Sequence, residues 1–215
     1  KEDPQTLSLF QSCVQSDASP SVRKAAVKAI VEYYKEDPQT LPLLQSCVQS
    51  DADSFVRSVA VYAIARNYKE DPQTLSLLQS WVQSARNSFV LKAAVDAIAQ
   101  YYKEDPQTLP LLQSWVLSDT NTYVLSAAVD AIARNYKEDP QTLPLLQSWV
   151  QSDADLNVRS AAVNAIAQYY KEDPQTLPLF QSWVQSDADG WVRSAAVYAI
   201  AQCYKEDPQT LSLFQ

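Results

Sequence analysis

The chain has 215 residues, of which 47% are hydrophobic and 20% charged, and this composition is typical of a globular protein. Seventeen basic and 25 acidic residues give a net charge of −8, which repels phosphate backbones and excludes nucleic acid as a partner. No apolar run approaches the roughly 18 residues that cross a bilayer, so we expect no membrane partner.

The hexapeptide KEDPQT occurs seven times, always 34 residues apart. Fixed self-similarity at this period is the signature of a repeat array. Each hexapeptide carries one basic and two acidic residues, so nearly all the net charge lies on one recurring loop, which we expect on the solvent side. We predict one repeat domain over residues 1–215, built from copies 1–34, 35–68, 69–102, 103–136, 137–170, 171–204 and the partial copy 205–215.

The first part of each copy predicts a helix. In the fifth copy, Asp139 and Pro140 are typical of a helix start, an N-cap followed by proline at the first helical position. A second proline, Pro144, predicts a 3₁₀-like or kinked first turn over residues 140–142, with Thr142 as a second cap. The helix then presents a broad apolar stripe made of Leu143, Leu145, Leu146, Trp149 and Val150.

The second part of each copy predicts another helix. Asp155 caps it, Tyr170 closes it, and its apolar residues fall on one side at helical spacing: Val158, Ala162, Ala165, Ile166 and Tyr169. One such hairpin leaves apolar flanks that only neighbouring copies can cover. We therefore predict an all-α chain of about thirteen helices without strands, arranged as a right-handed α-solenoid of stacked antiparallel helix pairs.

The second helices share a sequence pattern of an aspartate, a short loop, Val-Arg, and alanines with an aliphatic residue. Examples are DADSFVRSVAVYAIA at 51–65 and DADLNVRSAAVNAIA at 153–167. The pattern resembles the second half of a HEAT repeat. The tetratricopeptide repeat has a similar period but needs a glycine in its first helix, which is missing here. The copies are also similar to the short, nearly identical HEAT arrays of bacterial NACHT-type ATPases, and a designed array would look the same.

The HEAT resemblance implies an Asp–Arg ladder that links repeats, within or between copies. The implied members are Asp17, Asp51, Asp153 and Asp187 with Arg23, Arg57, Arg159 and Arg193. Asp119 retains the acidic position in the fourth copy, but Ala85, Leu91 and Leu125 replace ladder residues in the third and fourth copies. We therefore expect the ladder to be interrupted there, without extra protection from hydrogen exchange unless the leucines are buried.

The differences between copies concentrate on the second helices. On a helical wheel they form one stripe turned away from the apolar side, which in HEAT-like solenoids lines the concave face. Several are large aromatics, which mark partner sites when they are exposed together; the alternative is that some fold over a loop or plug a groove. The predicted partner-binding residues are Phe55, Ser58, Tyr62, Phe89, Lys92, Asp96, Tyr123, Ser126, Asp130, Asn157, Asn164, Trp191 and Tyr198.

The chain lacks the residues of common catalytic sites. It has no histidine, one glycine and three cysteines without a CxxC motif, so we expect no catalytic residue, no cofactor and no metal. Two functions remain: a scaffold that binds a protein or peptide through the stripe, and a structural spacer or designed scaffold without a natural ligand. No signal-peptide pattern is present and nothing requires an oxidising compartment, so we expect a cytoplasmic protein.

Two further expectations concern burial. Four tryptophans at one position of the first helix are predicted to be buried, and Trp191 to be exposed; the four are Trp81, Trp115, Trp149 and Trp183. Apolar residues at the two ends should keep exposed area, which predicts weak head-to-tail self-association. These end residues are Leu7, Phe10, Cys13 and Val14 at one end and Tyr198, Tyr204, Leu211 and Phe214 at the other.

Overall fold

The computed structural model describes residues 3–118, 121–152, 155–187 and 189–205. The chain divides into two compact units, Lys1–Thr108 and Leu109–Gln215, and each unit is described by itself. All regular secondary structure within the described ranges is α-helical, which confirms the predicted all-α class. The organisation as a single domain stays a prediction.

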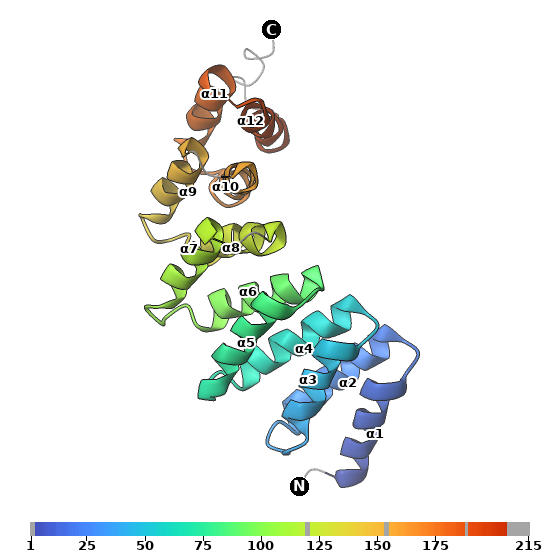
Figure 1. Cartoon of the computed structure of the whole chain (residues 1–215). Coiled ribbons are helices and arrows are strands. Elements are labelled where there is room, and N and C mark those ends of the chain that lie inside the picture. Colours follow the sequence, from blue (N-terminus) through green and yellow to red (C-terminus); the bar gives the residue numbers. More distant parts are fainter. Residues whose placement is uncertain (1–2, 119–120, 153–154, 188, 206–215) are drawn as a thin grey trace. The chain divides into compact units, whose positions relative to one another are not determined.

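The first unit contains three helix pairs. They are α1 (Pro4–Ser16) with α2 (Pro20–Tyr33), α3 (Thr40–Ser50) with α4 (Ser54–Asn67), and α5 (Pro72–Ser84) with α6 (Ser88–Tyr101). Each first helix packs against its own second helix, and the second helices α2, α4 and α6 pack in succession (Figure 1). The stack agrees with the predicted solenoid.

The second unit repeats this arrangement. Its helices are α7 (Thr108–Ser118), α8 (Thr122–Asn135), α9 (Thr142–Gln151), α10 (Leu156–Tyr169), α11 (Thr176–Ser186) and α12 (Gly190–Cys203). The pairs α9 with α10 and α11 with α12 are in contact, and α8, α10 and α12 pack in succession. The described residues thus contain twelve of the roughly thirteen expected helices, and the partial seventh copy lies outside them beyond residue 205.

The first helices start at two different places, depending on one residue. Where that residue is serine, α1 and α5 run unbroken from Pro4 and Pro72, capped by Asp3 and Asp71. Where it is proline, as at Pro144, the regular helix starts two residues later. Proline has no N–H to donate to the carbonyl four residues earlier, so the first turn stays a turn. The predicted irregular turn is confirmed for residues 140–141, whereas Thr142 already belongs to α9.

The predicted capping role of Thr142 is wrong. The N-cap is Gln141, whose side chain makes no capping bond, and the buried Thr142 hydroxyl donates instead to the Tyr136 carbonyl at 2.7 Å. Tyr136 ends the preceding second helix, so this bond closes the turn between two copies. Equivalent 2.7 Å bonds are made by Thr40, Thr108 and Thr176.

The hexapeptide loop is bonded on both sides, although its charged side chains face solvent. The Asp139 N–H donates to the Tyr136 carbonyl at 3.0 Å, and its carboxylate accepts from the Gln141 N–H at 2.8 Å. A tyrosine that ends a second helix can also reach the loop that begins its own copy: the Tyr68 hydroxyl donates to the Lys35 carbonyl at 2.7 Å. The end of one copy and both ends of the next copy therefore meet at such a loop, which gives a structural reason for its constancy.

The core consists of aliphatic residues from both helices of each pair and of the tryptophans of the first helices. On α10, Val158, Ala162 and Ile166 are buried as the wheel predicts. Small alanines allow neighbouring second helices to approach closely. The four tryptophans predicted to be buried are all buried, with Trp149 only 5% exposed, whereas Trp191 is 70% exposed, so both expectations are confirmed.

The first copy confirms the end-face expectation in part. Leu7, Phe10 and Cys13 are half-buried, but Val14 is buried, so the prediction is wrong for that residue. Val48, the equivalent residue one copy later, is buried as well. At the other end Tyr198 is exposed and Tyr204 half-buried, while Leu211 and Phe214 lie outside the described residues. Head-to-tail association stays a prediction.

Candidate partner-binding surface

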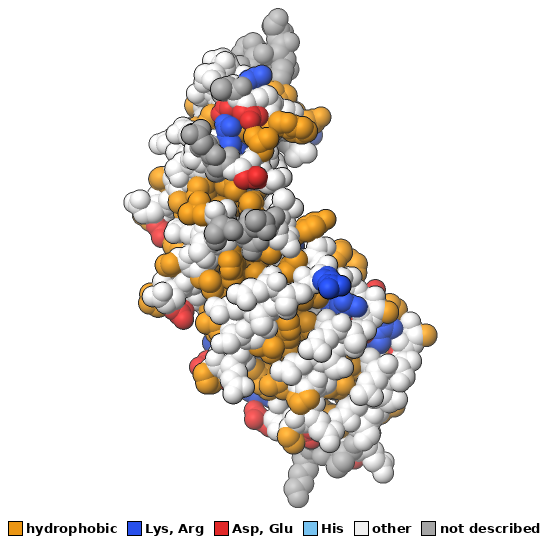
Figure 2. All heavy atoms as spheres, in the orientation of Figure 1, with side chains coloured by type: hydrophobic (Ala, Val, Ile, Leu, Met, Phe, Trp, Pro, Cys, Tyr) orange, Lys and Arg blue, Asp and Glu red, His pale blue; other side chains and the backbone are white. Residues whose placement is uncertain are grey.

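The thirteen residues predicted to bind a partner lie on five second helices, and we refer to them as the aromatic stripe. Phe55, Ser58 and Tyr62 are on α4, and Phe89, Lys92 and Asp96 are on α6. The other seven are on α8, α10 and α12 of the second unit. Hydrophobic side chains are exposed in both units on the face drawn in Figure 2.

In the first unit the stripe begins with an aromatic pair. The Phe55 and Phe89 ring centroids are 5.2 Å apart with their planes at 60°, and the side chains are 59% and 46% exposed. The Lys24 ammonium of α2 lies 5.9 Å from the Phe55 ring centroid. Three successive second helices thus contribute one contiguous patch with a cation at its edge, and edge-to-face ring pairs add about 1 kcal/mol beyond burial.

A groove of about 720 Å³ lies further along the same helices. It is lined from α2 by Lys28 and Glu32, from α4 by Tyr62 and Arg66, and from α6 by Tyr101, among others. The second helices of this unit therefore border a groove. Its lining contains both charges, so it suits a polar or zwitterionic segment better than a purely apolar one.

Asp96 and Ser58, two central residues of the stripe, are less exposed than predicted. Asp96 is only 4% exposed, and the hydroxyl of the half-buried Tyr62 donates to its carboxylate at 3.1 Å. Tyr62 stands one copy earlier at the same position, so stacking places its side chain over Asp96. Ser58 is half-buried as well, and its hydroxyl donates to the Phe89 carbonyl at 3.3 Å. Asp96 was therefore wrongly predicted to be exposed, and these residues link helices.

In the second unit the outermost residues are exposed. They are Tyr123, Ser126, Asn157, Asn164, Trp191 and Tyr198, and Lys92 of the first unit is exposed too. Asp130 is half-buried and accepts hydrogen bonds from the Tyr169 hydroxyl at 2.8 Å and, in an ion pair, from Arg134 at 3.5 Å. Asp130 thus behaves as an inter-helix acceptor, while the three aromatics of this unit remain available for a partner.

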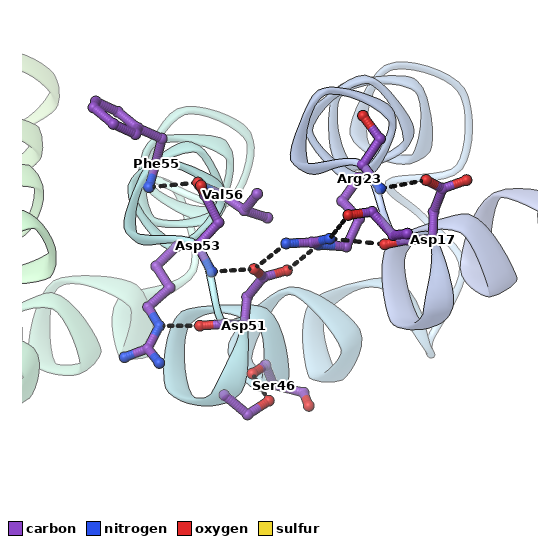
Figure 3. Close-up of polar contacts among 11 residues, drawn as sticks. Asp17, Arg23, Ser46, Asp51, Asp53, Phe55 and Val56 are labelled. Carbon is purple, nitrogen blue, oxygen red and sulfur yellow. Dashed lines mark hydrogen bonds and ion pairs between the residues drawn. The ribbon is translucent and has the colours of Figure 1, made fainter.

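The ladder implied by the HEAT resemblance joins one copy to the next. Asp51 accepts from Arg23 of the preceding copy through both carboxylate oxygens, at 2.8 and 2.9 Å, and also accepts from the Asp53 N–H (Figure 3). This hydrogen bond to Asp51 raises the pKa of Arg23. Arg159 and Asp187 form the second ladder pair at 2.9 Å. Bidentate pairs of this kind are among the stronger polar contacts in proteins.

The ladder is interrupted where the sequence predicts. Arg57 meets Ala85 instead of an aspartate, and its Nε donates to the Asp51 carbonyl of its own copy. Leu91 and Leu125, which replace ladder arginines, are both buried, so these substitutions are compensated by packing. Asp119 and Asp153 lie outside the described residues. Arg193 donates to the Asp187 carbonyl at 2.7 Å, and the expectation for hydrogen exchange stays a prediction.

The family model for HEAT repeats matches residues 1–65, 60–133 and 114–201. The chain belongs to the HEAT-repeat family. HEAT repeats generally serve as scaffolds for protein interactions, and their all-helical fold is typically non-enzymatic. A search of curated proteins found no match to the HEAT array.

Within the described ranges, no cluster of three or more His, Cys, Asp or Glu side chains could hold a metal ion. The helices searched over the same residues include none long and apolar enough to cross a membrane. Sequence reasoning missed the groove residues Glu32, Arg66 and Tyr101, although their positions vary between copies: Glu32 and Arg66 stand 34 residues apart at one position with opposite charge.

Proposed function

We propose that this HEAT array is a scaffold that binds a protein or peptide through the aromatic stripe. The observation that carries the proposal is the exposed Phe55–Phe89 pair, which stacking makes contiguous with Lys24 and which adjoins the groove of α2, α4 and α6. Exposed aromatic clusters are typical of partner sites, and aromatic residues are frequent anchors in interfaces. A segment with an apolar anchor and an acidic neighbour suits the two rings and the lysine.

The test is selection of peptides from a display library against the intact chain, followed by affinity measurements with variants. The double variant Phe55→Ser, Phe89→Ser should weaken binding of a selected peptide by at least about tenfold, since each buried aromatic anchor contributes roughly 1–2 kcal/mol or more. Tyr33→Ser is the matched control, because Tyr33 is an exposed aromatic outside the stripe. Equal affinity of the double variant and the control would contradict the proposal.

The second candidate is a structural spacer without a ligand, and the near identity of the copies favours it. A spacer has no reason to vary one stripe and keep the rest constant, so the stripe supports the scaffold. If the library yields no peptide above background, the spacer is the better function. The near identity also underlies two finer proposals: an array similar to those of NACHT-type ATPases, and a designed origin. The flanking sequence of the parent gene would distinguish these two.

The compartment and the self-association are proposals of the same kind. Cys13, Cys47 and Cys203 are free thiols, which suits a cytoplasmic protein. The half-buried Leu7, Phe10 and Cys13 suit weak head-to-tail stacking. Light scattering over a range of concentrations tests the stacking, which predicts a mass that rises with concentration.

A further inference from the structure

Two equivalent cavities lie in the first unit, one copy apart, at the loops that join first and second helices. The first cavity, of about 360 Å³, is lined by Arg23, Cys47 and Asp51. The second, of about 680 Å³, is lined by the residues 34 positions later, Arg57, Trp81 and Ala85. The second cavity is larger although tryptophan replaces cysteine in its wall. The missing Asp51 equivalent therefore leaves space that the larger side chain does not fill.

The two cavities also differ in charge. In the first, Asp17 and Asp51 accompany Arg23, and the ladder pair at 2.8 Å neutralises the guanidinium. In the second, Arg57 and Arg86 line the space, and no acidic residue does. A single substitution of the ladder aspartate, together with Arg86 in place of Ala52, converts a paired site into a cationic one.

The Arg57 guanidinium is anchored by a backbone carbonyl, as the arginines of the intact rungs are, although Arg23 uses Nη1 for its carbonyl, that of Asp17 at 2.7 Å. The Arg57 Nε donates to the Asp51 carbonyl, as the Nε of Arg159 donates to the Val150 carbonyl at 2.8 Å. Arg159 then uses Nη2 to grip both oxygens of Asp187, at 2.9 and 3.1 Å. For the corresponding Nη groups of Arg57, the described part of the chain provides no acceptor. The intact rungs of the ladder thus indicate that a carboxylate fits beside the Arg57 Nη groups.

We propose that the second cavity binds the carboxylate of an aspartate or glutamate side chain from a partner protein. The carboxylate would take the place that Asp51 and Asp187 occupy at the intact rungs, with Arg57 as the bidentate donor and Arg86 as a second cation. Leu77, Trp81 and Val90 line the apolar part of the cavity and suit an aliphatic neighbour in the partner segment. None of these residues belongs to the aromatic stripe, so this site does not depend on the proposed function.

The test follows the Arg Nε–Hε signals of the full chain by NMR during titration with acetyl-Leu-Asp-amide at constant ionic strength. The Arg57 signal should shift to saturation, while Arg23 and Arg159 should not move, because each already holds a carboxylate. Arg57→Lys should weaken the peptide by about tenfold, since a lysine lacks the planar fork. Acetyl-Leu-Asn-amide should bind at least about tenfold more weakly, because its neutral amide lacks the negative charge that roughly doubles the strength of such hydrogen bonds.

Ala85→Asp provides an internal competitor. It restores the residue that the other ladder copies carry, so its carboxylate should occupy Arg57 and abolish the peptide response. Ala85→Asn has the same size without the charge and should keep the response. An Arg57 signal that does not move, an unchanged response in Ala85→Asp, or inorganic phosphate bound as tightly as the Asp peptide would each overturn the carboxylate site. If Ala85→Asp does not fold, Arg57→Gln replaces it as the test. Loss of peptide affinity in Arg57→Gln is the expected result, and unchanged affinity would overturn the site.

Discussion

Replacing Trp149 and Trp191 by alanine compares two tryptophans of one unit that differ mainly in burial. Trp149 is 5% exposed on α9, and Trp191 is 70% exposed at the start of α12. A tryptophan side chain offers about 200 Å² of surface, and burial contributes ~25 cal/mol per Å². Trp149→Ala should therefore lower the free energy of unfolding by about 3–5 kcal/mol, cavity cost included. In Trp191 less than a third of this surface is buried, so Trp191→Ala should cost at most about 1.5 kcal/mol.

Urea denaturation followed by circular dichroism at the helix band measures both changes. Fluorescence is less suitable because five tryptophans contribute to the signal. In a repeat array, stability is carried by contacts between neighbours, so Trp149→Ala should also broaden the transition by weakening one junction. Equal shifts of the denaturation midpoint for the two variants would refute the assignment of one face to the core and the other to solvent.

Three further predictions use bonds between copies. Thr142→Val should cost about 1–2 kcal/mol, because the Tyr136 carbonyl loses a buried donor, and Thr142→Ser, which keeps the hydroxyl, should cost less in the same urea titration. Asp187→Ala should cost about 1–2 kcal/mol, since it removes the closer of the two carboxylates that pair with the half-buried Arg159 and leaves Asp189 at 3.5 Å. Asp187→Asn, which keeps an acceptor, should recover part of this, and an unchanged midpoint in both variants would show that the ladder adds no stability. Burial raises the pKa of Tyr68, Tyr102, Tyr170 and Tyr204 to about 12, so the unfolded chain loses these protons first. The contribution of these tyrosines to stability should be constant below about pH 10 and be lost between about pH 10 and 12, which denaturation midpoints across that range measure.

The periodicity of the sequence predicts most of the fold. A helix cannot continue through a proline without losing a hydrogen bond, so Pro144 alone indicates the late start of α9. Equivalent positions of the copies have similar burial, so the helical pattern of one copy distinguishes the buried Trp149 from the exposed Trp191. The predicted ladder follows from local residue identity, and its break at Ala85 is visible in the sequence.

Contacts between copies are less predictable. A wheel describes one helix, so it places Asp96 in solvent and does not include the Tyr62 side chain that stacking brings over it. The charged side chains of the hexapeptide predict a solvated loop. The bonds that join the copies there are made instead by backbone groups and by the Thr142 hydroxyl, which the sequence pattern does not reveal. Predicting the carboxylate site in the second cavity requires two observations together: the missing aspartate, which the sequence shows, and the bond of Arg57 to a backbone carbonyl, which only the structure shows.

The bonds at each hexapeptide loop have a consequence for how such a gene changes length. The Tyr68 hydroxyl reaches Lys35, and the Thr40 and Thr142 hydroxyls reach the tyrosine that precedes their own loops, so the same kinds of donor and acceptor recur at several junctions. Unequal recombination that adds or removes a multiple of 34 codons would rejoin matching ends wherever the break fell. Array length and surface chemistry can then evolve separately: duplication sets how many second helices are presented, and point substitution sets what each of them displays.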